Sequence, residues 1–400
     1  MERHANLGYI AFKRQDTDRL TVTDTPDVYL PIYSADIKTN PNFQRQNPIV
    51  GNKFASRSTL RGLRDHTGTL LLEGEPTTAT YLHDMFLTRD TETDNAGIIT
   101  TPFELDATTD PEFYTADISY VTHVVRYIGL AASQIVPEFD GNEMRFNCNV
   151  SCLKAWDGRE VASIDGQTIT FKQNYDREPT NGLVAGDTLQ VWDTTASVYI
   201  DVVVASVDST TVITVTGTIT AVAAGDFVTI KPASAPTFSN LPTFTWGNTE
   251  FRFGATAAAA LTATHTPLES DSSITLLHPF EEDTGAKRSG SFDPASLVRM
   301  QGDYNFTTRK YFDTPEDLLA YSAMDKKACV MRSFSYDDSG NTYEYRITLN
   351  NMTQGNPIPN LNSGDVLYSE IEFSGNYDDD DAKGMSVTVI SDTSLTPASS

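Results

Sequence analysis

Histidines and clustered carboxylates are the side chains of this sequence that could bind a metal ion or exchange a proton. One acidic run, Asp378–Asp381, offers several carboxylate oxygens of the kind that calcium prefers. It lacks the spaced ligands and closing glutamate of a calcium loop, so a solvated charge run is the favoured interpretation, and cation binding there stays open. The histidines are scattered with no pair at ligand spacing, which favours surface or packing roles for His4, His66, His83, His123, His265 and His278.

Catalytic and cofactor-binding motifs are absent from the sequence. It contains no phosphate-binding loop, no glycine-rich dinucleotide fingerprint, no nucleophile elbow and no zinc-protease helix motif. A carboxylate pair for glycoside hydrolysis could not be recognised among 54 acidic residues, because its two members need not be near each other in the sequence. The sequence therefore predicts a protein that is not an enzyme and has no cofactor and no metal.

The chain is strongly acidic, with a formal net charge of −25. Such a charge keeps a protein soluble and argues against affinity for nucleic-acid phosphates or anionic membranes, which recruit lysine and arginine. One interpretation is general solubility, for example in salty water. The other is a surface that must face nucleic acid without binding to it.

The cysteines and the apolar segments limit the cellular compartments in which the protein can be expected. Cys148 and Cys152 are roughly 13 Å apart if they share one strand, too far for a disulfide, so they are interpreted as small core residues. The first six residues contain no apolar signal region, and the most apolar window, Gly254–Ala263, is too short to span a membrane. We expect a soluble protein made in a cytoplasm.

The stretch Phe139–Trp156 contains the clearest element, around which we expect the fold to be organised. Its apolar residues fall on every second position, which predicts a strand with one face in a core: Met144, Phe146, Cys148, Val150 and Cys152. Many short apolar runs between turn residues extend this to an all-β fold. Proline near the first turn predicts short helices after Glu75 and after Thr314.

The composition changes at Gly158 and returns to the earlier style at about Pro236. This predicts three parts: the first part of a β domain in residues 1–157, an inserted β domain in 158–235, and the second part of the first domain in 236–400. The insert carries an internal repeat, in which Val161–Asp165 matches Val204–Asp208 and Ala185–Asp187 matches Ala224–Asp226. Duplicated hairpins of this kind predict a small β-barrel or sandwich.

Between Ile37 and Leu60 the sequence predicts no regular element. Long loops inside a compact domain are usually functional or disordered, and this one is rich in basic residues for so acidic a chain. One interpretation is a solvated loop, and the other is an arm that pairs with an acidic surface on another subunit. The candidates for such contacts are Asn40, Pro41, Phe43, Arg45, Lys53, Phe54, Arg57 and Arg61.

The order of these features resembles the major tail tube proteins of long-tailed, siphovirus-type bacteriophages. The resemblance covers about residues 7–157 and 236–391, and no compact motif carries it. Gly8–Lys13 resembles the opening strand of that family, and Val28–Ile37 with Asn40–Pro41 resembles its second strand and long loop. The approach to its first helix, which contains glycines, is matched by Gly68, Gly74, Pro76 and Leu82. Phe139–Asn142 resembles the start of its central strand, and Phe244–Ala257 resembles the continuation.

The resemblance implies a tail-tube-type β-sandwich or barrel core with an inserted small β-barrel or immunoglobulin-like domain. It further implies hexameric rings that self-assemble into a tube in the virion tail, after assembly in the host cytoplasm. The implied partners are further copies of the chain, the tape measure protein, the tail terminator and distal tail proteins, and DNA that passes through without sequence-specific binding. The basic loop 38–64 and the C-terminal segment would carry contacts between rings, and the insert would decorate the outside.

Two alternatives remain open. One is a capsid-surface or carbohydrate-binding β-protein in which the repeated insert is the binding module. The other is a carbohydrate-active enzyme, which turnover of polysaccharides would reveal.

Overall fold

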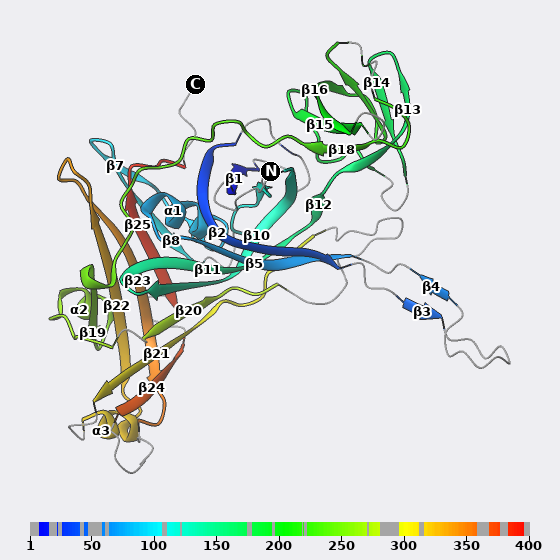
Figure 1. Cartoon of the computed structure of the whole chain (residues 1–400). Helices are drawn as coiled ribbons and strands as arrows, with labels where there is room; N and C mark the ends of the chain where they lie inside the picture. The colour runs from blue at the N-terminus through cyan, green and yellow to red at the C-terminus, as the bar shows by residue number, and fades with distance from the viewer. Residues whose placement is uncertain are drawn as a thin grey trace.

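The computed structural model describes residues 8–15, 22, 26–40, 44–46, 58–60, 64–105, 110–120, 122–173, 178–193, 197–217, 219, 222–269, 272–280, 296–311, 316–357, 368–376 and 383–395. Within these residues the chain is an all-β protein with three short α-helices (Figure 1). This confirms the predicted fold class and adds one helix, α2 (Ala257–Thr262), which the sequence did not indicate. None of the described helices is long and apolar enough to cross a membrane.

Six of the described strands pair edge to edge and close into a barrel. In order around the barrel they are β1 (Tyr9–Arg14), β2 (Val28–Asn40), β5 (Asp65–Glu73), β11 (Glu143–Cys152), β10 (Val124–Asp140) and β9 (Tyr114–Ser119), all antiparallel. The predicted central strand is β11, and the even-numbered side chains from Met144 to Cys152 are at most 1% exposed. The turn before β11 uses Gly141 at a φ of +68°, a conformation that favours glycine.

A second layer of strands continues the pairing from the far end of β10. It runs through β20 (Ser273–Leu277), β21 (Asp303–Tyr311) and β24 (Tyr368–Gly375) to β23 (Thr342–Gln354). One edge of β23 continues into β22 (Lys326–Tyr336) and β19 (Thr249–Gly254), which follows the 3₁₀ turn η2 (Trp246–Asn248). The other edge continues into β25 (Met385–Ser391), β8 (Ile98–Glu104), β6 (Thr88–Arg89) and β7 (Thr93–Asn95).

Helix α1 (Pro76–Asp84) lies inside the core that the barrel and this second layer share. The sequence predicted a short helix after Glu75, and in the structure all nine residues of α1 are buried. Leu82 packs in one apolar cluster with Phe146 of the barrel and Tyr345 of β23, which explains why neither side of the helix reaches water. Polar side chains on α1 therefore need partners inside the protein.

Residues 159–230 form a second closed barrel of six described strands. Around it run β13 (Arg159–Asp165), β14 (Thr168–Phe171), β17 (Val212–Val215), β16 (Val198–Val207), β15 (Thr188–Asp193) and β18 (Phe227–Ile230). Their inward apolar side chains make a cluster separate from that around α1. Of the predicted barrel or sandwich, the structure shows a barrel.

The two sequence repeats complete each other in this barrel. In the first repeat, the Gly186 N–H donates to Val204 O at 2.8 Å, and in the second the Gly225 N–H donates to Val161 O at 2.9 Å. Each turn is also held by its aspartate, since Asp187 and Asp226 accept from the backbone N–H three residues earlier at 2.8 Å. Neither repeat therefore closes on itself, because each supplies the turn that pairs with the other.

A buried arginine on β10 joins the inserted barrel to the first one. Arg126 donates to both carboxylate oxygens of Asp117 on β9, at 2.7 and 2.8 Å, and to both of Asp187, at 2.8 and 3.0 Å. Next to it, β12 (Lys154–Trp156) pairs with β10, and Trp156 belongs to the apolar cluster of the insert. The ion-pair network and the tryptophan fasten the two barrels together.

Replacing Arg126 with methionine should lower the free energy of unfolding by about 3–5 kcal/mol, because two carboxylates would stay buried without their cation. Urea denaturation of the full chain measures the loss. Arg252→Met is the control, since its partner Glu250 is partly exposed, and it should cost less than about 1 kcal/mol. Equal losses in the two variants would contradict the central role of Arg126.

Candidate self-association surfaces

The second half of strand β2 presents an open edge. Residues Val28–Pro31 pair with β1, and Ile32–Asn40 pair with β5 on the opposite edge. Within the described residues no strand pairs with the first edge beyond Pro31. Asp36 and Lys38, exposed and paired with each other at 2.8 Å, lie along this stretch, as charges often do on strands that must not aggregate. The Ile37 carbonyl of this stretch accepts from the Tyr127 hydroxyl at 3.1 Å, and the rest of the open edge offers backbone groups to a strand from another chain.

Strands β2 and β5 lead into a separate antiparallel ladder of β3 (Gln44–Gln46) and β4 (Ser58–Leu60). Figure 1 shows this ladder projecting away from the body of the protein. Of the predicted contact residues, Asn40 ends β2 opposite Asp65, and Arg45 stands opposite Thr59 in the ladder. Pro41, Phe43, Lys53, Phe54, Arg57 and Arg61 lie outside the described residues.

The prediction that residues 37–60 contain no regular element is wrong. Strand β2 continues to Asn40, and β3 and β4 form a paired ladder. The physical reason is that backbone pairing forms these ladders without the apolar alternation from which half-buried strands are predicted. A polar composition therefore does not by itself indicate irregular structure.

An exposed apolar helix lies at a different extremity of the molecule. Helix α3 (Glu316–Ala323), between β21 and β22, lies at the lower left in Figure 1, away from the β3–β4 ladder. Leu319 is 64% exposed and Met324, just after the helix, is 81% exposed, with Leu318 and Tyr321 also exposed. Water contact with so many large apolar groups in one short segment is typical of an interaction surface. The sequence predicted this helix but not its exposure.

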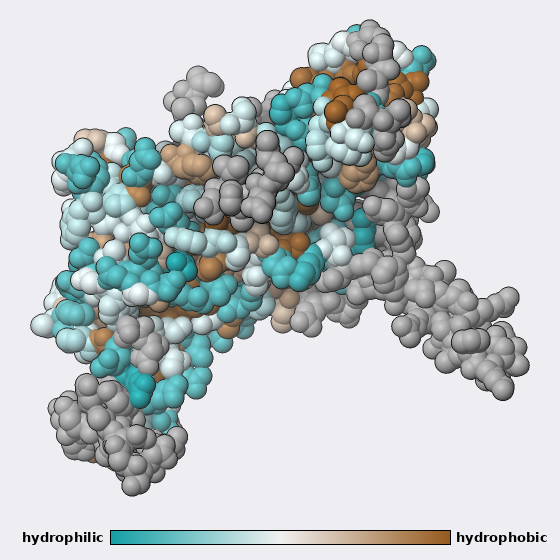
Figure 2. Space-filling model, in the orientation of Figure 1, coloured by the Kyte–Doolittle hydropathy of each residue, from teal (hydrophilic) through white to brown (hydrophobic). Residues whose placement is uncertain are grey.

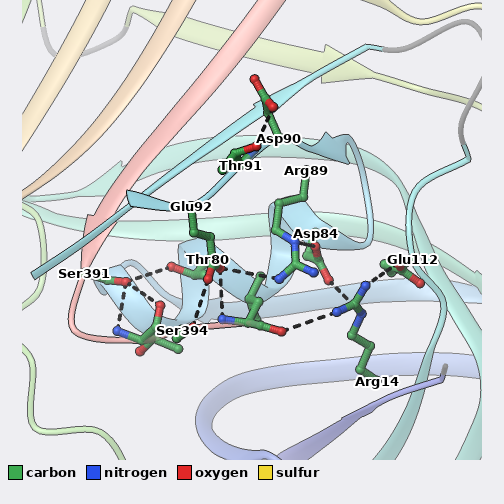
Figure 3. Close-up of polar contacts among 12 residues, drawn as sticks. Arg14, Thr80, Asp84, Arg89, Asp90, Thr91, Glu92, Glu112, Ser391 and Ser394 are labelled. Atoms are coloured by element: carbon green, nitrogen blue, oxygen red, sulfur yellow. Dashed lines mark hydrogen bonds and ion pairs between the residues drawn. The ribbon is translucent and has the colours of Figure 1, made fainter. Parts of the chain in front are cut away.

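A cluster of charged groups surrounds the end of helix α1 (Figure 3). Asp84 is fully buried and accepts from the Tyr114 hydroxyl at 2.5 Å, with Arg89 Nε 3.6 Å and Arg14 Nε 3.7 Å from its two oxygens. Burial raises the pKa of Asp84 above its ordinary value, while Tyr114 and the two arginines act in the opposite direction. Arg14 also pairs with Glu112. The arrangement compensates a buried carboxylate at the helix end.

The same cluster fixes the described end of the chain. Glu92 accepts from the Leu395 N–H at 3.0 Å and from the Ser394 hydroxyl at 2.9 Å, and Arg14 donates to Leu395 O at 3.3 Å (Figure 3). Residues 393–395 are thus bound within their own subunit. The expected role of the C-terminal segment in ring contacts stays a prediction.

A cavity of about 820 Å³ lies beside this core, lined in part by His278, Arg299 and Tyr304. Its arginine is engaged structurally, because Arg299 donates to Met85 O at 2.5 Å, to Ala132 O at 2.8 Å and to His278 O at 3.1 Å. The first of these bonds satisfies a carbonyl group at the end of α1, and the other two hold β10 and the residue after β20 beside it. In the part of the chain that the structure describes, no three histidine, cysteine, aspartate or glutamate side chains are grouped to hold a metal ion.

His83 of α1 is an uncharged core residue, as its packing interpretation predicted. Its Nδ1–H donates to Ala79 O at 2.8 Å, and its Nε2 accepts from the Tyr345 hydroxyl at 3.2 Å. Burial lowers the pKa of His83 to about 4, against the opposing effect of the bond to Ala79. Among the other predicted packing histidines, His66 and His278 are also buried, and His4 lies outside the described residues.

Comparison of the sequence with models of protein families and with curated proteins finds no match.

The native state disfavours protonated His83. The free energy of unfolding should therefore be highest above the ordinary histidine pKa and should fall as the pH drops from about 6.5 toward 4. Between neutral pH and about pH 5 this one residue accounts for a loss of about 2 kcal/mol. In His83→Gln, whose amide can keep both hydrogen bonds, the loss over this range should be smaller by that amount. Urea denaturation at several pH values measures it, and parallel curves for the two proteins would contradict the assignment.

Proposed function

We propose that this chain is a structural protein that assembles with its own copies into rings, which stack into a phage tail tube. The observation that carries the proposal is the open edge of β2 and its continuation in the projecting β3–β4 ladder. A two-stranded ladder has no core of its own and is marginal in water. Pairing with another subunit would supply the missing neighbours.

Charge supports the same role for the ladder. The segment 38–64 contains Lys38, Arg45, Lys53, Arg57, Arg61 and Arg64, in a chain whose net charge is −25. A basic arm on an acidic body is complementary to the body of another copy. Both partners of the contact are then present in one chain, which is what a homomeric assembly requires.

The open β2 edge and α3 are two different, well-separated surfaces of one chain, and this separation favours assembly into a ring. An interface that joins two different patches of identical subunits runs head to tail, and it closes into a ring when the rotation between neighbours permits. In Figure 1 the β3–β4 ladder and α3 lie at different extremities of the molecule, so one subunit can contact two neighbours at once. Ring symmetry, including the expected hexamer, follows from that rotation and is part of the proposal.

The acidic composition suits a tube that conducts DNA. Binding to phosphates draws its free energy from counterions that lysine and arginine release, and an acidic lumen offers no such exchange. DNA would then pass without being held. In this proposal the tape measure protein fills the tube before DNA enters, tail terminator and distal tail proteins bind its two ends, and the protein resides in the virion tail after assembly in the host cytoplasm.

The arm can be removed without disturbing the strands that lead to it. Asn40 and Asp65 are paired neighbours, so replacing residues 41–63 with Asn-Gly and retaining Arg64 leaves a short hairpin loop between them. The variant should fold, because no described core residue is deleted, and it should fail to form rings or tubes. Negative-stain electron microscopy over a concentration series, with circular dichroism as the folding check, tests both statements.

The matched control inserts Asn-Gly between Ser339 and Gly340, in the exposed hairpin of β22 and β23, and should leave assembly unchanged. Normal tubes from the arm deletion would remove the observation on which the proposal rests. Discrete single particles of the unmodified protein at every concentration, even when seeded with tail fragments, would overturn the proposal itself.

Helix α3 gives an independent test. Leu319→Glu and Met324→Glu place a charge at positions that are already largely in water, so the free energy of unfolding should change by less than about 0.5 kcal/mol. If the same positions are buried between subunits, the two glutamate variants should fail to assemble or should require a much higher protein concentration. Tyr336→Glu, at a residue that is 55% exposed on β22, is the control, and identical behaviour of all variants would exclude α3 from the interface.

A further inference from the structure

The outer face of the inserted barrel carries a groove lined by aromatic rings. Trp192 on β15 stands between Tyr199 on β16 and Phe227 on β18 as their cross-strand neighbour. The indole and the Tyr199 ring meet edge to face, with centroids 4.9 Å apart. Together with Thr229 these side chains line a groove of about 260 Å³. Tyr199 and Phe227 are each more than 40% exposed, and Figure 2 shows apolar residues at the surface of this barrel.

Two polar atoms beside the rings have no hydrogen-bond partner among the described residues. They are the Thr229 hydroxyl oxygen and the Gln190 side-chain carbonyl oxygen. Thr229 lines the groove and is only 8% exposed, and Gln190 is its direct partner across the strands, on the same face. A buried polar atom without a partner costs free energy that a ligand can recover. This face therefore combines an aromatic surface with a donor and an acceptor side by side.

The charged groups around the groove are neutralised by one another. Lys231 pairs with Asp201, and Lys172 pairs with Glu160, all on strands or turns that border the rings. No unpaired charge among the groove-lining residues would attract an ion or a phosphate. The site accordingly suits a neutral ligand.

We infer that this groove binds a neutral saccharide, with a pyranose ring against the aromatic rings. The C–H face of a pyranose is slightly positive and flat, and it complements the negative face of an indole or a phenol. A sugar hydroxyl can donate to Gln190 Oε1 and accept from the Thr229 hydroxyl, which satisfies both atoms. Few placed polar groups on an aromatic surface are typical of small-ligand sites.

A proline-rich peptide is the other ligand that aromatic grooves bind, and the polar atoms distinguish the two. Successive prolines have no N–H groups and offer only carbonyl acceptors. The Gln190 oxygen is itself an acceptor, so such a peptide would leave it without a partner. Sugar hydroxyls supply the missing donor. This inference does not depend on the proposed tube assembly, because it concerns a single inserted barrel.

Isothermal titration calorimetry of the full chain tests the inference, with maltohexaose, cellohexaose and chitohexaose as neutral probes and decaproline as the peptide comparison. We expect at least one hexasaccharide to bind at millimolar concentration or below, and decaproline not to bind. Trp192→Ala should weaken that binding by about tenfold or more, which corresponds to the loss of one good contact. Thr229→Val, which replaces the hydroxyl with a methyl group of similar size, should weaken it severalfold.

Two further variants separate binding from folding. Trp192→Phe retains a ring and should bind more tightly than Trp192→Ala, and Tyr336→Ala removes an exposed aromatic side chain on β22 and should bind as the unmodified protein does. Absence of binding for all three hexasaccharides would overturn the inference. So would saccharide binding that Trp192→Ala leaves unchanged, or binding of decaproline in place of the sugars.

Discussion

The complete burial of helix α1 is the constraint on which the arrangement of the first barrel and the second layer depends. A helix that no water reaches must find partners for its polar side chains inside the protein. His83 uses Ala79 O and the Tyr345 hydroxyl, and Asp84 uses Tyr114 with two arginines. These partners come from β23, β9, β1 and β6, so the barrel and the second layer are held to one mutual arrangement. Arg299 and His278 extend the same function to the carbonyl groups at the helix end.

The sequence predicted the elements whose burial pattern is local. Alternation from Met144 to Cys152 identified β11 because one face of that strand is in the core and the other is not. The two Ala-Gly-Asp segments identified the turns of the insert because each aspartate bonds to its own turn. Sequence patterns of this kind report a residue's near neighbours, and they were sufficient for the all-β class and the inserted barrel.

What the sequence could not predict depends on contacts between distant segments. Helix α1 has apolar residues at ordinary helical spacing, and strands distant in the sequence bury it. Tyr345 of β23 contacts His83, whereas residues of β9, β1 and β6 surround Asp84. Beyond Ile37, which is the last buried apolar residue of β2, the sequence carries no apolar alternation, so nothing in its pattern distinguishes a paired ribbon from a loop. The exposure of Leu319 and Met324 and the aromatic groove around Trp192 likewise follow from tertiary structure, because the same residues could equally have packed inside.

The attachment of the inserted barrel has a consequence for loop-closure entropy. The chain leaves the first barrel at Trp156 and returns at Ile230, and these residues pair with Arg126 and Val124, only two positions apart on β10. An unfolded excursion of that length would oppose the pairing of the strands on either side, by an amount that grows with the logarithm of its length. Once the insert has closed its own barrel, its two ends are already neighbours. To the strands around it, the folded insert then behaves as a short connection, whatever its size.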